Sequence, residues 1–191
     1  RYAFGSQPTV GAWNLMKLAE ALYPLVGEAK QLQEGLDAFK NTFQEQYTSL
    51  RYQKLGLSLP TTPAKNAVVN RLYDIMEHTE TDLTILFRLL SNLSIESMVN
   101  QDMASEKTAI IQDAFYQYQS WDESMHSRWG DWLTNYVELL KQDGLDEFIR
   151  HQQMCSVNPK YIIRNYLAPM AIGDVVAGDD TMLHSLLTVL K

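Results

Sequence analysis

The segment EAKQLQEGLDAFKNTFQEQYTSLRYQKL, residues 28–55, decides the fold class of this chain. Its apolar positions advance in steps of three or four residues, which is the spacing of one face of an α-helix. These positions are Leu32, Leu36, Phe39, Phe43, Tyr47 and Leu50. Charged and amide side chains occupy most positions between them, so the segment predicts one long amphipathic helix with a single buried stripe.

The same helical spacing recurs on both sides of this segment. Further apolar sets begin at Leu15, Val68, Leu83, Ile110, Trp121 and Met182. Pro24 is expected to end the first helix, and Gly144 is expected to end the helix that follows Trp121. No run alternates apolar and polar residues as a half-buried strand does. The sequence therefore predicts an all-α fold of eight or nine packed helices.

Two stretches interrupt the helical pattern. Residues 56–63 combine glycine, serine and two prolines, and residues 91–105 are rich in serine and asparagine. The first stretch is short enough to be a loop inside one domain, and the second is predicted to be irregular. Residues 1–191 are thus expected to form a single helical domain.

Composition and charge exclude several classes of partner. The 191 residues carry a formal net charge of −7, and their 16 basic residues are scattered. Nucleic-acid and anionic-membrane surfaces need clustered Lys and Arg, so neither partner is expected. The single cysteine, Cys155, excludes an internal disulfide and a multi-cysteine zinc site, and is interpreted as an inert thiol. No apolar run approaches the length of a membrane span.

Each of the four histidines follows an acidic residue by four positions. The pairs are Asp74 and His78, Asp122 and His126, Glu147 and His151, and Asp180 and His184. Residues at this spacing are neighbours on a helix, and an acid on the N-terminal side suits the helix dipole. We interpret them as solvated pairs on helix faces. The alternative, a helical enzyme that uses the pairs for acid–base or metal chemistry, requires them to converge in space.

Three further groups have a structural interpretation and a functional alternative. The carboxylates could form a solvated face or a metal site: Asp74, Glu77, Glu80 and Asp82. The tryptophans could pack in the core or line a base-stacking groove: Trp13, Trp121, Trp129 and Trp132. The pair Tyr161 and Arg164 could be structural or could bind an anion. The structural interpretation is preferred for each. No glycine-rich phosphate loop is present. The sequence therefore predicts no catalytic, cofactor-binding or metal-binding residue in this chain.

Asn158 followed by Pro159 is typical of a helix N-terminus. Asparagine is a favoured N-cap residue, and proline is tolerated at the first helical position. The predicted helix continues past Arg164, and Pro169 lies well inside it. Because proline lacks a backbone donor, this helix is expected to kink or end near Ala168.

Two long segments resemble a known family. They are RYAFGSQPTVGAWNL at residues 1–15 and NPKYIIRNYLAPMAI at residues 158–172, with FRLLS at residues 87–91 between them. In this order they resemble the selenoprotein O family of pseudokinase-type protein adenylyltransferases. The likeness spans nearly the whole chain and is weakest over residues 60–119. Ser6 and Pro169 depart from the residues usual in the family.

The resemblance implies an activity for a longer protein. Enzymes of this family transfer AMP from ATP, with Mg²⁺, to Ser, Thr or Tyr hydroxyls of protein substrates, and their ATP-handling residues precede the first segment. This chain is therefore expected to be the helical C-lobe and C-terminal extension of such an enzyme, without its catalytic residues. ATP and Mg²⁺ are expected for the parent enzyme and no cofactor for this fragment. The family's redox-active cysteine motif would follow Lys191.

The resemblance also implies partners and a location. The expected partners are the missing N-terminal kinase-like half and the parent's protein substrates, and self-association through the exposed docking face is expected as well. The parent would be cytoplasmic if bacterial and mitochondrial if eukaryotic. The alternative to this whole interpretation is a stand-alone helical protein-interaction domain without enzymatic activity.

Overall fold

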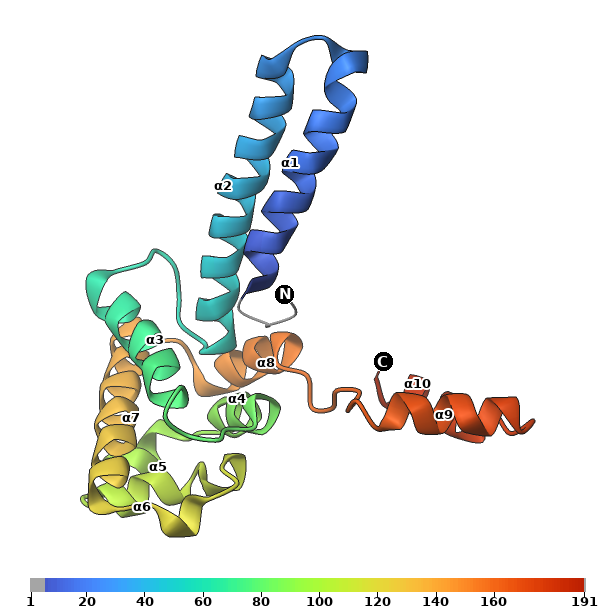
Figure 1. Ribbon diagram of the computed structural model, residues 1–191. Helices are drawn as coiled ribbons and strands as arrows, with labels where there is room; N and C mark the ends of the chain where they lie inside the picture. The colour runs from blue at the N-terminus through green and yellow to red at the C-terminus, as the bar shows by residue number, and fades with distance from the viewer. Residues whose placement is uncertain (1–5, 191) are drawn as a thin grey trace. The chain divides into compact units, whose positions relative to one another are not determined.

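The computed structural model describes residues 6–190, and nearly all of their regular structure is helical (Figure 1). The α-helices are α1 (Gln7–Val26), α2 (Ala29–Lys54), α3 (Pro63–Met76), α4 (Leu83–Ser91), α5 (Ile95–Val99), α6 (Ala104–Ala109), α7 (Glu123–Asp143), α8 (Glu147–Val157), α9 (Leu167–Val176) and α10 (Thr181–Val189). Two short 3-10 helices, η2 (Gln112–Ala114) and η3 (Tyr118–Ser120), lie between α6 and α7. Within the described residues, β-structure is limited to one isolated bridge between Thr81 and Phe115. The all-α prediction is confirmed.

The chain divides into two compact units, Arg1–Leu50 and Arg51–Lys191. The first unit is a hairpin of α1 and most of α2 (Figure 1). The predicted amphipathic helix is confirmed as α2, but its stripe is not buried: Tyr47 and Leu50 are each 43% exposed, and the earlier stripe residues are half-buried. The aromatic side chains of the stripe stack along the helix. The ring centroids of Phe39 and Phe43 are 6.1 Å apart, and those of Phe43 and Tyr47 are 5.7 Å apart. The expectation of a single domain across residues 1–191 stays a prediction.

Gly27, and not Pro24, ends α1. The helix continues through Pro24 to Val26, and Gly27 then adopts φ 73°, a left-handed conformation that suits glycine. The Gly27 N–H donates to the Tyr23 carbonyl at 2.8 Å, which closes the last turn. Because Pro24 stands in that last turn, it removes a single donor near the end of the helix and does not break it.

Helix α7 forms the centre of the second unit, where it packs against α3, α5 and α6. Trp129, Trp132 and Tyr136 on its inner face are buried. The Trp132 indole N–H donates to the Val68 carbonyl at 2.9 Å, and the Tyr136 hydroxyl donates to the Leu55 carbonyl at 2.7 Å. Such bonds satisfy the polar tips of buried aromatic residues and fix the register of α7 against the chain beside it.

The prediction that the tryptophans pack in a core is confirmed for Trp129 and Trp132. Trp121 precedes α7 and is half-buried, with its ring centroid 4.5 Å from that of Phe115. Trp13 lies on α1 and keeps 54% of its surface exposed, so it is not a core residue.

Helix boundaries between residues 91 and 157 differ from the sequence prediction. The stretch expected to be irregular contains α5 and the start of α6, whereas residues 110–115, expected to be helical, form a turn and η2. Gly144 ends α7 with φ 62°, as predicted. Helix α8 was not predicted, and Asp146 begins it as an N-cap whose carboxylate accepts from the Phe148 and Ile149 N–H groups.

The loop at residues 56–62 is confirmed, and a buried ion pair holds it in place. The Lys65 ammonium lies 2.7 Å from the Asp143 carboxylate, and both side chains are 9% exposed. Lys65 also donates to the Ser58 carbonyl, and the Ser58 N–H donates to Asp143. The pair therefore ties the loop to the start of α3 and the end of α7.

Candidate functional site

Asn158 does not begin a helix, so the N-cap prediction is wrong. It is the C-cap of α8, and its own N–H donates to the Met154 carbonyl at 2.8 Å. Residues 158–166 are irregular, and the next helix, α9, begins only at Leu167. Pro169 is the third residue of α9, where a missing N–H breaks no intrahelical bond, so the predicted kink is wrong as well.

The Asn158 side chain is instead a buried connection between three segments. Its amide Nδ2 donates to the Lys54 carbonyl at 2.9 Å and to the Ser91 hydroxyl at 3.4 Å, and its Oδ1 accepts from the Lys54 ammonium at 3.3 Å. The Asn158 carbonyl accepts from the Arg88 guanidinium at 2.9 Å. Burial lowers the pKa of Lys54. Asn158 thus joins the last turn of α2, the end of α4 and the end of α8.

Arg164 is the second anchor of the irregular segment 158–166. Its guanidinium lies 2.6 Å from the carboxylate of Asp82, the buried N-cap residue of α4. Burial alone would raise the pKa of Asp82, but hydrogen bonds from the Ile85 N–H and from Arg164 outweigh it, so the pKa is lowered. Because the segment is not helical, Tyr161 and Arg164 do not lie one turn apart on a helix as the predicted helix would place them, and the structural role of Arg164 is an ion pair with the N-cap residue of α4.

The lowered pKa of Asp82 predicts an acid-sensitive fold. A carboxylate whose pKa is lower in the folded state stabilises the protein above the unfolded-state pKa of about 3.9, and that contribution disappears as pH falls through the folded-state pKa. We expect the urea midpoint of the chain to fall between neutral pH and about pH 3. In Asp82→Asn the fall should be smaller, and an unchanged pH profile would contradict this assignment.

The four acid–histidine pairs do not converge. His184 alone contacts its acid through side chains, with Nε2 3.3 Å from the Asp180 carboxylate. His78 instead meets the Asp74 backbone carbonyl, His126 meets the Thr108 hydroxyl and His151 meets the Ser91 carbonyl. The interpretation as helix-face pairs therefore holds only for Asp180 and His184 among the four pairs. The rings of His126 and His151 each have a partly buried structural contact in another segment.

The remaining chemistry-bearing groups also lie apart. Within residues 6–190, no three His, Cys, Asp or Glu side chains gather closely enough to hold a metal ion. Of the four acids between residues 74 and 82, Asp82 is buried in its ion pair and so does not belong to a solvated face. Cys155 is half-buried, with its Sγ 3.6 Å from Nε2 of His151. The first five residues of the first family-like segment lie outside the described residues.

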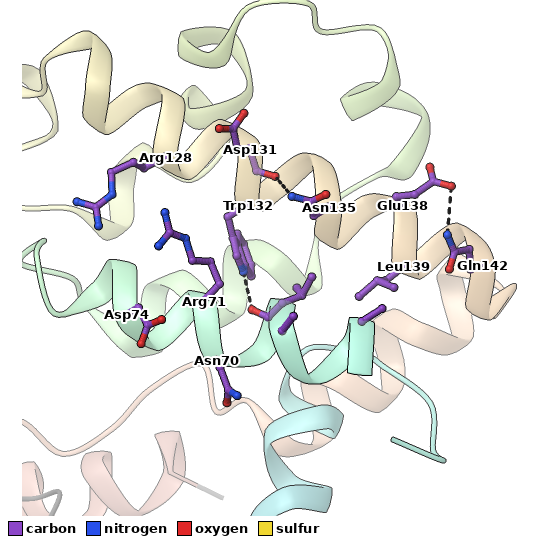
Figure 2. Close-up of a pocket in the computed structure, with 13 residues that line it drawn as sticks. Asn70, Arg71, Asp74, Arg128, Asp131, Trp132, Asn135, Glu138, Leu139 and Gln142 are labelled. Carbon is purple, nitrogen blue, oxygen red and sulfur yellow. Dashed lines mark hydrogen bonds between the residues drawn. The ribbon is translucent and has the colours of Figure 1, made fainter. Parts of the chain in front are cut away.

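A groove of about 650 Å³ runs between α3 and α7 (Figure 2). Ala64, Ala67 and Val68 of α3 and Trp132 and Leu139 of α7 form its apolar lining. Its polar lining consists of Asn70, Arg71, Asp74, Arg128, Asp131, Asn135, Glu138 and Gln142. This groove was not predicted from the sequence, although its residues on α7 follow one another at helical spacing: Arg128, Asp131, Asn135, Glu138 and Gln142.

None of the helices between residues 6 and 190 combines the length and hydropathy of a membrane span.

The chain matches the family model described as "Protein adenylyltransferase SelO" over residues 1–191. It is 37% identical to the protein nucleotidyltransferase YdiU of Flavobacterium johnsoniae and 36% identical to that of Rhodopirellula baltica, in both cases along its whole length. It covers only 35% and 36% of these two relatives.

Asn158 and Arg164 lie in one of the two family-like segments, and each fixes an irregular stretch to α4 or its N-cap through polar contacts. The match extends from the first residue to the last, although the chain spans only about a third of the relatives' length. On this evidence, the chain belongs to the SelO family of protein adenylyltransferases.

Proposed function

We propose that this chain is the C-terminal helical part of a protein adenylyltransferase and contributes structure, while the catalytic residues lie elsewhere in the longer protein. The observation that carries this proposal is the family match over all 191 residues of a chain that covers 35% of a curated relative. The whole enzyme would transfer AMP from ATP, with Mg²⁺, to hydroxyl groups of protein substrates. The chemistry of such a transfer needs a cradle for the phosphates and a bound metal.

The described residues support a structural role for this part. Their buried charges, Lys65, Asp82 and Arg150, are all occupied by contacts within the fold. The 650 Å³ groove brings two arginines together with three carboxylates and no lysine, which is a poor setting for a triphosphate. The charged groups of this part are thus suited to holding helices together and to contacting other protein.

A nucleotide-binding measurement tests this proposal directly. We expect calorimetric titration of the chain with ATP and Mg²⁺ to show no binding in the micromolar range, and α-labelled ATP to transfer no label to protein acceptors. The full-length Flavobacterium johnsoniae relative serves as the positive control for both assays. Micromolar affinity or label transfer by the chain alone would contradict the proposal that the catalytic residues lie elsewhere in the longer protein.

A second expectation concerns the surface that would face the rest of the longer protein. Helices α9 and α10 pack against each other around an apolar groove of about 360 Å³ lined by aliphatic side chains alone. Large apolar side chains also remain exposed on these two helices, among them Met170, Ile172, Val175, Val176, Leu183, Leu187 and Val189. Exposed apolar patches of this kind mark interaction surfaces. We infer that they contact the part of the protein that this chain does not include.

The exposed apolar surface of α9 and α10 should make the chain alone self-associate. In sedimentation velocity the average mass is expected to rise with concentration, and Val176→Ser with Leu187→Ser should reduce that rise. Val99→Ser on α5 is the matched control, because Val99 is also exposed but lies apart from this surface. A monomer at every concentration would count against the docking surface and favour a stand-alone helical domain.

A further inference from the structure

The groove between α3 and α7 is suited to a protein ligand. Its volume of about 650 Å³ lies within the ordinary range of binding pockets, and its floor is apolar. Two alanines, Ala64 and Ala67, lie one turn apart on α3. Their small side chains keep that wall shallow, so that a chain laid along the groove can come close to both helices.

Two arginines project into the groove without a partner. Arg71 from α3 and Arg128 from α7 both reach into the space between the helices (Figure 2). Among residues 6–190, neither guanidinium has a hydrogen bond or an ion pair within the fold. The other arginines of the second unit behave differently, since Arg51, Arg88, Arg150 and Arg164 each donate to a group on another helix or segment. Arg71 and Arg128 are therefore free to bind an external acceptor.

Carboxylates surround the two arginines and limit what the acceptor can be. Asp74 stands three residues after Arg71, Asp131 stands three residues after Arg128, and Glu138 lies farther along α7. The chain as a whole has a net charge of −7. A polyanion such as nucleic acid would be repelled by these groups, whereas a single carboxylate can pair with the arginines while nearby amide or basic groups meet the acids.

We propose that the groove between α3 and α7 binds an amphipathic helix of a protein partner, with a Glu or Asp side chain held by Arg71 and Arg128. Arginine suits this role because its planar fork can donate two parallel hydrogen bonds to one carboxylate. Apolar side chains on the same face of the partner helix would pack on Ala67, Val68 and Leu139. Arg128 and Glu138 are ten positions apart on α7, or about 15 Å, so the partner could also place a basic residue against Glu138.

A peptide library tests this proposal. The probe is a bead-displayed set of amphipathic helical peptides with a randomised apolar stripe and one polar position fixed as Glu, compared with the same set carrying Gln at that position. The fluorescently labelled 191-residue chain is the bait. We expect about tenfold greater capture on the Glu beads, because charge-assisted pairs are roughly twice as strong as neutral hydrogen bonds.

Variants assign the preference to the two arginines. Arg71→Gln with Arg128→Gln should abolish the preference for Glu, and Arg71→Lys with Arg128→Lys should keep part of it, since lysine retains the charge but loses the planar fork. Lys30→Gln with Lys40→Gln is the charge-matched control, because both lysines are exposed on α2 in the other unit. Circular dichroism and thermal melting should match the unmodified chain in all variants.

Several results would overturn the proposal. They are equal capture on Glu and Gln beads, no capture on either, a preference that survives in the double glutamine variant, and a preference for the Gln beads. Sedimentation velocity of the double glutamine variant provides a further test. If the double glutamine variant abolished self-association of the chain, a second copy would be the occupant and the proposed partner would be wrong. Because the nucleotide titration uses no peptide, its outcome is independent of this one.

Discussion

Lys65→Met is expected to lower the free energy of unfolding by about 3–5 kcal/mol. The Lys65 ammonium and the Asp143 carboxylate are 2.7 Å apart with both side chains nearly buried, so the substitution leaves a carboxylate in the interior without its cation. It also removes the donor to the Ser58 carbonyl, which lies at 2.7 Å. Methionine keeps the apolar length of the lysine stem, so the loss measures mainly the charge. Urea unfolding at neutral pH gives the value.

Lys141→Met is the matched control for this prediction. Lys141 also lies near the end of α7 and pairs with Glu138, but at 3.6 Å and with both side chains substantially exposed. Exposed pairs contribute little, so the change should stay within about 0.5 kcal/mol. Equal effects at the two lysines would contradict the assignment of a buried ion pair.

Measurements in acid and a second substitution at Asp143 isolate the electrostatic part of the stability lost in Lys65→Met. Burial raises the pKa of Asp143, but hydrogen bonds from Lys65 and Ser58 outweigh it, so the pKa is lowered in the folded chain. The stability from this group is therefore present above about pH 4 and disappears at lower pH. The deficit of Lys65→Met should shrink in acid. Adding Asp143→Asn to Lys65→Met should recover part of the loss, since the amide oxygen can still accept from Ser58.

The parts of the fold that follow from local periodicity could be predicted from the sequence. Helices α2, α7 and α10 carry apolar side chains at regular helical spacing, so their positions agree with the prediction to within a few residues. Helix α8 lacks that pattern. Its buried residues are Arg150 and Met154, whereas Phe148 and Ile149 are exposed. The Arg150 guanidinium donates to the Leu90 carbonyl in the last turn of α4 and to the Leu93 carbonyl just after that helix, so tertiary contacts select the buried face of α8.

Proline positions were misjudged because the expected helix boundaries were wrong. The effect of a proline depends on whether its missing N–H had a partner, and that depends on where the helix begins and ends. Pro24 lies in the last turn of α1 and Pro169 in the first turn of α9, so neither produces the break expected at an interior position. The family resemblance, by contrast, was confirmed because it rests on long segments and does not depend on any helix boundary.

The candidate sites, like the helices, were predicted only as far as local sequence patterns determine them. The sequence placed Arg164 and Asn158 in the most distinctive segment, but local rules assigned both to a helix that does not form there. Their partners, Asp82 for Arg164 and Lys54 and Ser91 for Asn158, are more than sixty residues away. Spacing along a chain cannot identify such partners, since they depend on how α2, α4 and α8 pack together. The groove with Arg71 and Arg128 was missed for the same reason.

Asn158→Ala is expected to lower the free energy of unfolding by about 2–4 kcal/mol, because it removes three side-chain hydrogen bonds and leaves the part-buried Lys54 carbonyl without its donor. Asn158→Ser distinguishes this role from helix capping. Serine is a good N-cap residue and would restore a capped helix, but its short hydroxyl cannot span the positions that the asparagine amide joins. We therefore expect Asn158→Ser to stay within about 1 kcal/mol of Asn158→Ala.

Asn165→Ala provides the matched control for the Asn158 series, since Asn165 is exposed in the same irregular segment and should change stability by no more than about 0.5 kcal/mol. If capping were the role of this residue, urea unfolding would show a near-normal stability for Asn158→Ser. That result would contradict the role of Asn158 as a buried connection. In a full-length relative, the equivalent variants should lose AMP transfer only in proportion to the fraction of protein that is unfolded. A stable but inactive Asn158→Ser equivalent would instead give this segment a direct part in the chemistry, which contradicts the structural role argued from its contacts with α2, α4 and α8.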